Sequence, residues 1–216
     1  MVGNISDYHS IVFDCDGVVL NSNKVKTEAF FKAALPYGET AAQQLVDYHI
    51  QRGGISRYKK FEWFIENVVA GQAGPSLDEL LAAYATEVSH GLLTCDIAEG
   101  LAELKAKTPQ ANWLIVSGGD QQELREVFAK RNIARLFDGG IFGSPDSKDD
   151  ILARQLSSQL IKQPALFLGD SKYDFKAATS AGLDFVFLSD WTEVPDWQAF
   201  CQANHIQSFN TLSELI

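Results

Sequence analysis

The stretch "SIVFDCDGVVLNS", residues 10–22, places Asp14 and Asp16 at the end of an apolar run and directly before a glycine. A run this apolar predicts a buried strand over 11–14. Burying a carboxylate that has no partner costs several kcal/mol, so a buried pair of them needs compensation. We therefore expect another group to compensate the charge of these two aspartates.

Further apolar runs predict strands of the same kind along the chain. They lie at 113–117, 165–170 and 185–189, with weaker ones at 140–144 and 205–209. The runs are continuous rather than alternating, which is typical of parallel strands covered on both faces. Helical patterns lie between them, at 97–106 behind Asp96, at 120–132, at 149–160 and at 172–181. This alternation predicts an α/β fold with a doubly wound, Rossmann-like parallel sheet.

The first strand is followed by helical patterns only, up to about residue 91. Helices are predicted over 25–34, 41–50, 61–69 and 77–88, the last behind a Ser76–Glu79 capping box. We interpret 21–91 as an inserted helical cap domain, with the catalytic core formed by 1–20 and 92–216. An elaborate crossover packed against the sheet is the alternative.

Composition excludes several classes of partner. The chain has 216 residues, 46% of them hydrophobic and 21% charged, and a net charge of −10. Such a charge argues against nucleic acid as a partner, because a phosphate backbone requires a basic surface. No apolar run is long enough for a membrane span, no signal peptide is evident, and three distant cysteines form no disulfide framework. We expect a cytoplasmic protein with a small-molecule partner; the sequence does not predict its oligomeric state.

The predicted strand ends carry polar side chains that the topology would bring to one edge of the sheet, where ligands bind in such folds. They are Asp14, Asp16, Ser117, Gly118, Lys148, Asp170 and Asp174. Taken singly, an aspartate after a strand is most often a helix cap or a turn residue, and most lysines are surface charges. Taken together, clustered carboxylates favour Mg²⁺, and a hydroxyl, glycine amides and a lysine beside it favour a phosphate group.

The order and spacing of these residues resemble the haloacid dehalogenase-like superfamily, in its branch with a helical cap, which includes phosphoglycolate phosphatases and β-phosphoglucomutases. "DCDGV" at 14–18 resembles the nucleophile motif of that family, and "GDSKYDFKAATSAG" at 169–182 resembles its acidic motif. Ser117 and Lys148 match the two motifs between them by their order along the chain. The resemblance covers nearly the whole sequence.

The resemblance implies a role for each matched residue. Asp14 would be the nucleophile that forms an aspartyl-phosphate, and Asp16 the general acid and then the general base. Mg²⁺ would be held by Asp14, the backbone carbonyl of Asp16, Asp170 and, directly or through water, Asp174. Ser117, the amide of Gly118 and Lys148 would hold the phosphoryl oxygens. Relatives that displace halide typically lack the second aspartate, so Asp16 favours phosphoryl transfer.

A basic segment in the predicted cap points to the substrate. Residues 49–61 contain Arg52, Arg57, Lys59 and Lys60 and no acidic residue. A solvated helix start is one interpretation, although cations are unfavourable at a helix N-terminus. "GISR" at 54–57 resembles the cap loop of β-phosphoglucomutases, in which the arginine binds a substrate phosphate, and Arg57 is the matching residue. We expect Arg57 and Lys60 to contact the substrate.

Two departures favour a phosphatase over a mutase. The mutases carry a histidine where this chain has Lys26, and commonly Glu-Asp where it has Gly169 and Asp170. We expect a Mg²⁺-dependent phosphomonoester hydrolase acting on a small metabolite, a sugar phosphate or a compound similar to phosphoglycolate. A phosphomutase of the β-phosphoglucomutase type and a non-catalytic relative that binds a phosphorylated metabolite are the alternatives.

Overall fold

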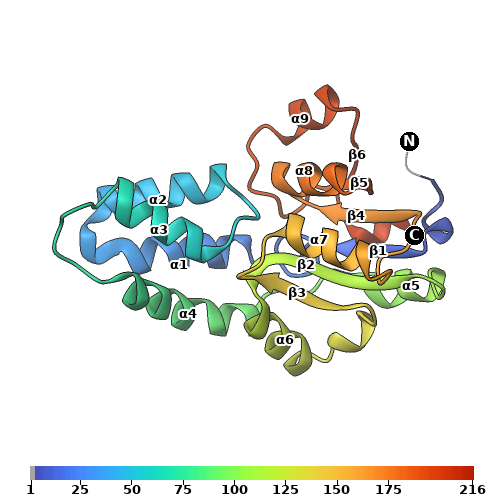
Figure 1. The fold of residues 1–216 in the computed structure, drawn as a ribbon, viewed down its shortest axis with the longest axis horizontal. Coiled ribbons are helices and arrows are strands. Elements are labelled where there is room, and N and C mark those ends of the chain that lie inside the picture. The colour runs from blue at the N-terminus through green and yellow to red at the C-terminus, as the bar shows by residue number, and fades with distance from the viewer. Residues whose placement is uncertain (1–2) are drawn as a thin grey trace.

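The structure is a computed structural model that describes residues 3–216, and within them a six-stranded parallel sheet forms the core (Figure 1). The strand order is β3-β2-β1-β4-β5-β6. The strands are β1 Ser10–Phe13, β2 Asn112–Asp120, β3 Gly140–Ser144, β4 Ala165–Gly169, β5 Asp184–Leu188 and β6 Gln207–Phe209. The predicted doubly wound α/β class is confirmed, and both of the weaker strand predictions correspond to strands.

β1 lies in the middle of the sheet, between β2 and β4. From β1 the chain builds outward in one direction to β2 and β3, and later in the other direction to β4, β5 and β6. Ligands of such sheets bind beyond the carboxyl ends of the strands at the point where the order reverses. The topology therefore places the candidate site at the ends of β1, β2 and β4.

Helices cover the sheet on both faces, which accounts for the continuous apolar runs of β1 and β4 (Figure 1). α5 Leu101–Lys107 and α6 Gln121–Lys130 cover one face, and α7 Lys148–Ser157, α8 Lys172–Ser180 and α9 Trp197–Ala203 cover the other. Successive residues of β1 point to opposite faces, as the pleat requires. Ile11 and Phe13 join the first cluster of buried side chains and Val12 joins the second.

Four helices lie to one side of the sheet, at the end of the molecule away from the chain termini (Figure 1). They are α1 Asn23–Ala34, α2 Glu39–Gln51, α3 Arg57–Asn67 and α4 Leu77–Thr94. Their shared interior contains Phe30, Phe61, Phe64 and Tyr84, all buried and in aromatic contact with one another or with neighbouring rings. The predicted capping box is present, with the Ser76 and Glu79 side chains each bonded to the other residue's backbone amide.

The helix predicted over 97–106 is wrong at its start, because α5 begins only at Leu101. Ile97 instead forms an antiparallel bridge with Leu20, and the amide of Ala98 donates to the carbonyl of Val19 at 2.9 Å. These bonds hold the segment that leaves the core against the segment that returns to it. Both connections to the four helices therefore lie side by side.

The helix predicted over 61–69 begins earlier than expected, at Arg57. Ser56 caps it, its hydroxyl oxygen accepting from the amide of Lys59. The shift brings the basic residues Arg57 and Lys60 into the first turn of a packed helix, where both are buried.

Short 3₁₀ helices complete the chain. They are η1 Ile5–Asp7, η2 Leu35–Tyr37, η3 Ala134–Leu136 and η4 Leu212–Leu215. Among the helices of residues 3–216, none has the length and apolar character that crossing a membrane requires.

Candidate active site

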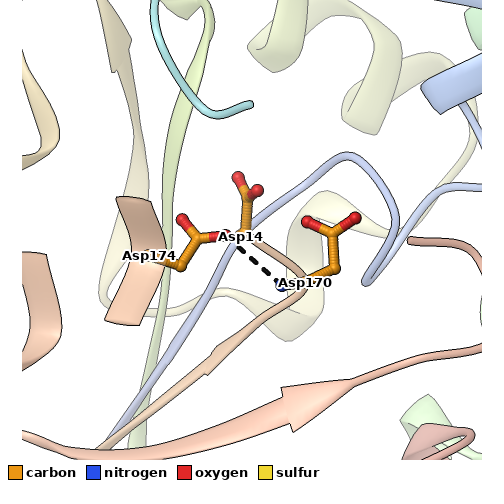
Figure 2. Close-up of side chains that lie close together, drawn as sticks. All are labelled: Asp14, Asp170 and Asp174. Atoms are coloured by element: carbon orange, nitrogen blue, oxygen red, sulfur yellow. Dashed lines mark hydrogen bonds between the residues drawn. The ribbon is translucent and has the colours of Figure 1, made fainter. Parts of the chain in front are cut away.

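Three carboxylates meet beyond the ends of β1 and β4, as the strand-end prediction required (Figure 2). Asp14, Asp170 and Asp174 are all buried, and each offers one oxygen that lies within 4.8 Å of the others. Like charges at this spacing repel one another, and burial adds to the cost of keeping them ionised. An all-oxygen, acidic set of this kind fits a hard divalent cation such as Mg²⁺.

Lys148 supplies a positive charge within this cluster. It is the first residue of α7, behind the capping residue Ser147, and its side chain is fully buried. Its Nζ lies 2.9 Å from Asp14 Oδ1 and 2.5 Å from Asp174 Oδ1. Burial alone would lower the pKa of Lys148, but the two carboxylates outweigh it and raise that pKa above its ordinary value. Lys148 is therefore a protonated bridge between two acids.

The carboxylates of Asp14 and Asp174 differ in how many hydrogen bonds they accept from the protein. Asp174 Oδ2 accepts from the amide of Asp170 at 3.3 Å (Figure 2), and from the amide and hydroxyl of Ser171 at 3.1 and 2.7 Å, while its Oδ1 faces Lys148. Asp14 Oδ1 accepts from the amide of Cys15 and from Lys148, whereas no hydrogen bond to its Oδ2 is found in residues 3–216. Burial raises the pKa of Asp14 to about 7 although Lys148 opposes the change. Asp14 thus keeps one oxygen available to a ligand.

Asp170 is held in place from the start of α1. Its Oδ2 accepts from Asn23 Nδ2 at 2.8 Å, and burial, followed by the nearby Asp14 carboxylate, raises the pKa of Asp170 well above its ordinary value. Gly17 turns the chain beside it with φ +76°, and a Cβ at this position would lie 2.1 Å from Asp170 Oδ2. The glycine after the two aspartates is therefore required by both the turn and the close approach of a carboxylate.

Asp16 has its own pair of donors, apart from the three-carboxylate cluster. Ser22 Oγ donates to its Oδ1 at 2.6 Å, and Lys26 Nζ lies 2.5 Å from its Oδ2. Burial would raise the pKa of Asp16, but Lys26 and Ser22 together hold it below its ordinary value. The same pairing overcomes the effect of burial on Lys26 and raises the pKa of that ammonium. The two aspartates of the opening motif thus have different chemistry.

The end of β2 brings backbone amides to the site. Ser117 is fully buried, and its Oγ accepts from the amide of Gly119 at 3.0 Å. Gly118 lines the pocket above Asp14, and a Cβ there would lie 2.2 Å from the carbonyl oxygen of Gly54. The loop before α3 therefore packs directly on the backbone of β2, which only glycine permits.

One pocket joins the acidic edge of the sheet to the basic face of the four helices. Its walls include Asp14, Asp16, Asp170 and Gly118 from the sheet side, and Lys26, His49, Arg57, Lys60 and Tyr84 from the helical side. The structure thus brings both predicted cap residues, Arg57 and Lys60, to the pocket that contains the predicted nucleophile.

Arg57 is engaged with an acid of the core. Its guanidinium forms a two-pronged ion pair with Glu123 of α6 and lies 4.6 Å from the centroid of the Tyr84 ring. Next to it, Tyr58 Oη donates to Asp120 Oδ2 at 2.8 Å. The start of α3 is therefore tied to the start of α6 by two polar contacts.

Lys60 is engaged with a neutral base. It is 2% exposed, and its Nζ lies 2.7 Å from Nδ1 of His49, whose Nε2 lies 3.1 Å from Thr27 Oγ1. Burial, with a further contribution from Lys26, lowers the pKa of Lys60 to about 7. Burial and then Lys60 hold the pKa of His49 well below its ordinary value. His49 is therefore neutral and Lys60 is the more basic of the pair.

Three residues that line the pocket, Asn23, Lys26 and His49, were not predicted as site residues, and neither was Glu123, which pairs with Arg57. Lys26 was visible in the sequence only as a departure from a family pattern. Its contact with Asp16 depends on the turn that brings the start of α1 back over β1. Glu123 is 66 residues from Arg57, and no local pattern indicates that pair.

Comparisons with known proteins agree with the fold and the motif order. The family model for haloacid dehalogenase-like hydrolases matches residues 8–182. Similar solved structures include CbbY from Rhodobacter sphaeroides in complex with phosphate, with a TM-score of 0.71, 16% identity and 96% of each chain covered. A predicted phosphatase from Clostridium acetobutylicum has a TM-score of 0.70 and 17% identity, again over 96% of both chains. A haloacid dehalogenase-like family protein from Streptococcus pneumoniae has a TM-score of 0.68 and 18% identity, over 96% of this chain and 97% of its own.

A search of curated proteins found no match. The solved structures, all far below 25% identity, show a shared fold. The family itself is shown by the model that matches most of the sequence, including both aspartate motifs and the helical segment between them. The predicted resemblance is confirmed: the chain belongs to the haloacid dehalogenase-like hydrolases.

Proposed function

We propose that the protein is a Mg²⁺-dependent phosphatase that hydrolyses a small phosphorylated metabolite through an aspartyl-phosphate on Asp14. The observation that carries this proposal is the asymmetry of the two aspartates. Asp14 has a free oxygen beside Lys148 and two further carboxylates, whereas Asp16 is held by Ser22 and Lys26 and faces the same pocket. A nucleophile and a separate proton carrier are what two-step phosphoryl transfer needs.

Asp14, Asp170 and the backbone carbonyl of Asp16, with Asp174, would hold the cation. Both oxygens of Asp174 already accept hydrogen bonds from the protein, which favours for Asp174 a contact through water. Bound Mg²⁺ neutralises charge on the phosphate and on the carboxylate that approaches it. The crowded, buried acids fit this cation because they leave excess negative charge that Lys148 alone does not balance.

In the first step Asp14 forms a bond to phosphorus and the ester P–O bond breaks, while protonated Asp16 donates its proton to the leaving oxygen. In the second step Asp16 accepts a proton from water as the water oxygen attacks phosphorus, and Asp14 is released with inorganic phosphate. Lys26 favours the carboxylate form of Asp16, which is the form that the second step needs, so Asp16 must take up a proton from solvent before the first step. Lys148, the amide of Gly118 and the Ser117 hydroxyl would hold the phosphoryl oxygens; Ser117 Oγ already accepts from the amide of Gly119, which leaves its own proton free to be donated.

The four helices α1–α4 would act as a cap domain that closes the pocket and selects the substrate, through Arg57 and Lys60 among others. We place the first boundary near residue 21, as the sequence predicted. α4 continues to Thr94, so we place the second boundary at the end of that helix rather than at 91. The paired connections at Leu20 and Ile97 are suited to a hinge, because both links between the core and the four helices lie side by side there.

The proposal is tested with p-nitrophenyl phosphate and a panel of phosphorylated metabolites, assayed with Mg²⁺ and with EDTA. We expect phosphate release that Mg²⁺ supports and EDTA abolishes. No metal-dependent release from any ester would overturn the proposal. A mutase would instead isomerise a sugar phosphate while the total ester phosphate stays constant.

A further inference from the structure

Four buried cations surround the pocket or lie beneath it, and they differ in their partners. Lys148 pairs with Asp14 and Asp174, Lys26 pairs with Asp16, and Arg57 pairs with Glu123. The Nζ of Lys60 has no carboxylate within 4.0 Å among the residues that the structure describes, and its one hydrogen-bond partner there is the ring of His49. A buried ammonium without an anion is costly, so this position needs an explanation.

A chain of hydrogen bonds fixes how Lys60 is presented. The Thr27 hydroxyl donates to Glu193 Oε2 at 2.7 Å, because a carboxylate only accepts. Thr27 Oγ1 therefore accepts from His49 Nε2, which puts the single proton of the neutral ring on that nitrogen. The lone pair of His49 Nδ1 then accepts from Lys60 at 2.7 Å. The chain orients the ammonium as a donor and leaves its other protons without carboxylate partners.

Lys60 also lies in the right place to meet a substrate. It lines the same pocket as Asp14 but belongs to α3, on the helical side, and the carboxylates of the opposite wall come from the sheet. Phe30, Ile50 and Val194 also line the pocket that contains Lys60 and these carboxylates. In such apolar surroundings a charge–charge contact is stronger than in water. A molecule bound at Asp14 through one phosphate thus has a buried cation available to a second group.

We propose that Lys60 binds a second anionic group of the substrate, so that the physiological substrate is a phosphate ester that also carries a carboxylate or a second phosphate. This inference rests on the proposed phosphatase function. His49 and Thr27 are positioning residues in it, because they orient Lys60.

The test uses pairs of esters that differ by one anionic group. Ethyl phosphate against 2-phosphoglycolate tests a carboxylate, and fructose 6-phosphate against fructose 1,6-bisphosphate tests a second phosphate. We expect the wild-type protein to prefer the doubly anionic member of at least one pair by about tenfold or more in kcat/KM, which corresponds to about 1.4 kcal/mol. The pair that shows the preference identifies the second group.

Variants then assign the preference to Lys60. Lys60→Met should reduce the ratio within the pair to about one, chiefly by raising KM for the doubly anionic ester, and Lys60→Arg should restore part of it. Lys59→Met is the matched control, because it removes the same charge one residue away from an exposed position, and it should leave the ratio unchanged.

The outcomes separate this inference from the function on which it rests. If the wild-type protein hydrolyses both members of every pair equally well, or Lys60→Met keeps the preference, the role of Lys60 is refuted and the phosphatase stands. If no ester is hydrolysed with Mg²⁺, the phosphatase proposal is refuted, and this inference is refuted with it because it depends on that function. The wild-type ratios test the inference even if Lys60→Met does not fold.

Discussion

Each wall of the pocket contains a buried lysine, and the pKa values of these two lysines are shifted in opposite directions. On the sheet side, Lys148 lies between two carboxylates, and its pKa is raised although burial opposes this. On the helical side, Lys60 meets only a neutral histidine, and burial lowers its pKa to about 7. Both side chains are equally inaccessible to water. Burial therefore does not determine the protonation of a lysine by itself; the partners that the fold supplies do.

The difference indicates what each wall is built for. Each charged side chain near Asp14 is held by a fixed hydrogen-bond or ion-pair partner within the protein, with the excess negative charge left for a metal cation, which suits chemistry that must take place with little rearrangement. The helical wall leaves one charge to be satisfied from outside, which suits selection among ligands. We call the sheet side of the pocket the completed wall and the helical side the incomplete wall. The following changes test whether this division is correct.

Asp14→Asn should have the largest effect, because it removes the proposed nucleophile from the completed wall. We expect phosphatase activity to fall by about 10³-fold or more, as for other residues that form a covalent intermediate. Steady-state assays on p-nitrophenyl phosphate measure this loss. Asp47→Asn, at an exposed position of α2, is the control and should retain full activity. Substantial turnover by Asp14→Asn would mean that another group attacks phosphorus.

Lys148→Met should destabilise the protein, because it leaves Asp14 and Asp174 buried with no cation between them. Removing one partner of a buried ion pair costs about 3 to 5 kcal/mol, and urea unfolding in EDTA measures the loss. Saturating Mg²⁺ should recover part of it, since binding to the folded state adds stability. Lys172→Met is the control, because Lys172 pairs with Asp196 at the surface and should change stability by less than about 1 kcal/mol. An unchanged stability for Lys148→Met would contradict the ion-pair arrangement.

Lys60→Met should change stability in the opposite direction. The pKa of Lys60 is about 7 in the folded protein, below the ordinary lysine value of 10.5. Between these values the unfolded chain binds the extra proton, so the wild-type stability rises with pH there. At pH 7 the variant should be more stable by about 1 kcal/mol or more, and its advantage should shrink by about 1 kcal/mol per pH unit towards pH 10. Urea unfolding of both proteins at several pH values measures the difference.

Comparing the variant with the wild type cancels the titration of other groups to a first approximation. The charged and titratable groups that act on Lys60 are His49 and Lys26 from neighbouring helices, and Asp16, Glu193 and Lys148 from the sheet side. A stability difference independent of pH would show that Lys60 has an ordinary pKa, and with it an anionic partner within the protein.

The sequence predicted the completed wall far better than the incomplete one, for a physical reason. Asp14, Ser117 and Asp170 lie at or just beyond the carboxyl ends of three parallel strands, and β1 is hydrogen-bonded to both β2 and β4. The sheet alone therefore brings these residues to one edge. Lys148 lies shortly after β3, which pairs with β2, so the same sheet topology brings it to this edge. The predicted start of α5 behind Asp96 was wrong because Ile97 forms a bridge with Leu20, 77 positions earlier. No local pattern reveals such a partner.

The helical wall depends on how α1–α4 pack on one another and on the core. Lys60 was expected near the substrate only from the charge of its segment, and its lack of a carboxylate partner could not be predicted. That property arises from α2 placing His49, rather than an acid, beside it. Likewise, the pairing of Lys26 with Asp16 requires the turn at Gly17 and the start of α1 to be known together.

Glu123→Gln should have the smallest effect, because it acts on the contact between the walls rather than on either of them. It weakens the ion pair with Arg57 but leaves the bond from Tyr58 to Asp120 in place. The glutamine side chain still offers Arg57 an accepting oxygen, so we expect a loss of only about 1 kcal/mol and amide exchange over 52–58 that is about fivefold faster. Glu126→Gln, exposed on the next turn of α6, is the control and should leave exchange in that segment unchanged.

The same variant separates Arg57 from Lys60 as anion-binding residues. Releasing Arg57 from Glu123 frees a guanidinium that still lies over the Tyr84 ring at the edge of the pocket. If Arg57 shares the second anionic group with Lys60, Glu123→Gln should lower KM for doubly anionic esters and leave singly anionic ones unchanged. If KM rises equally for both kinds of ester, the ion pair serves only to keep the proposed cap closed, and Lys60 is the single free cation of the incomplete wall within residues 3–216.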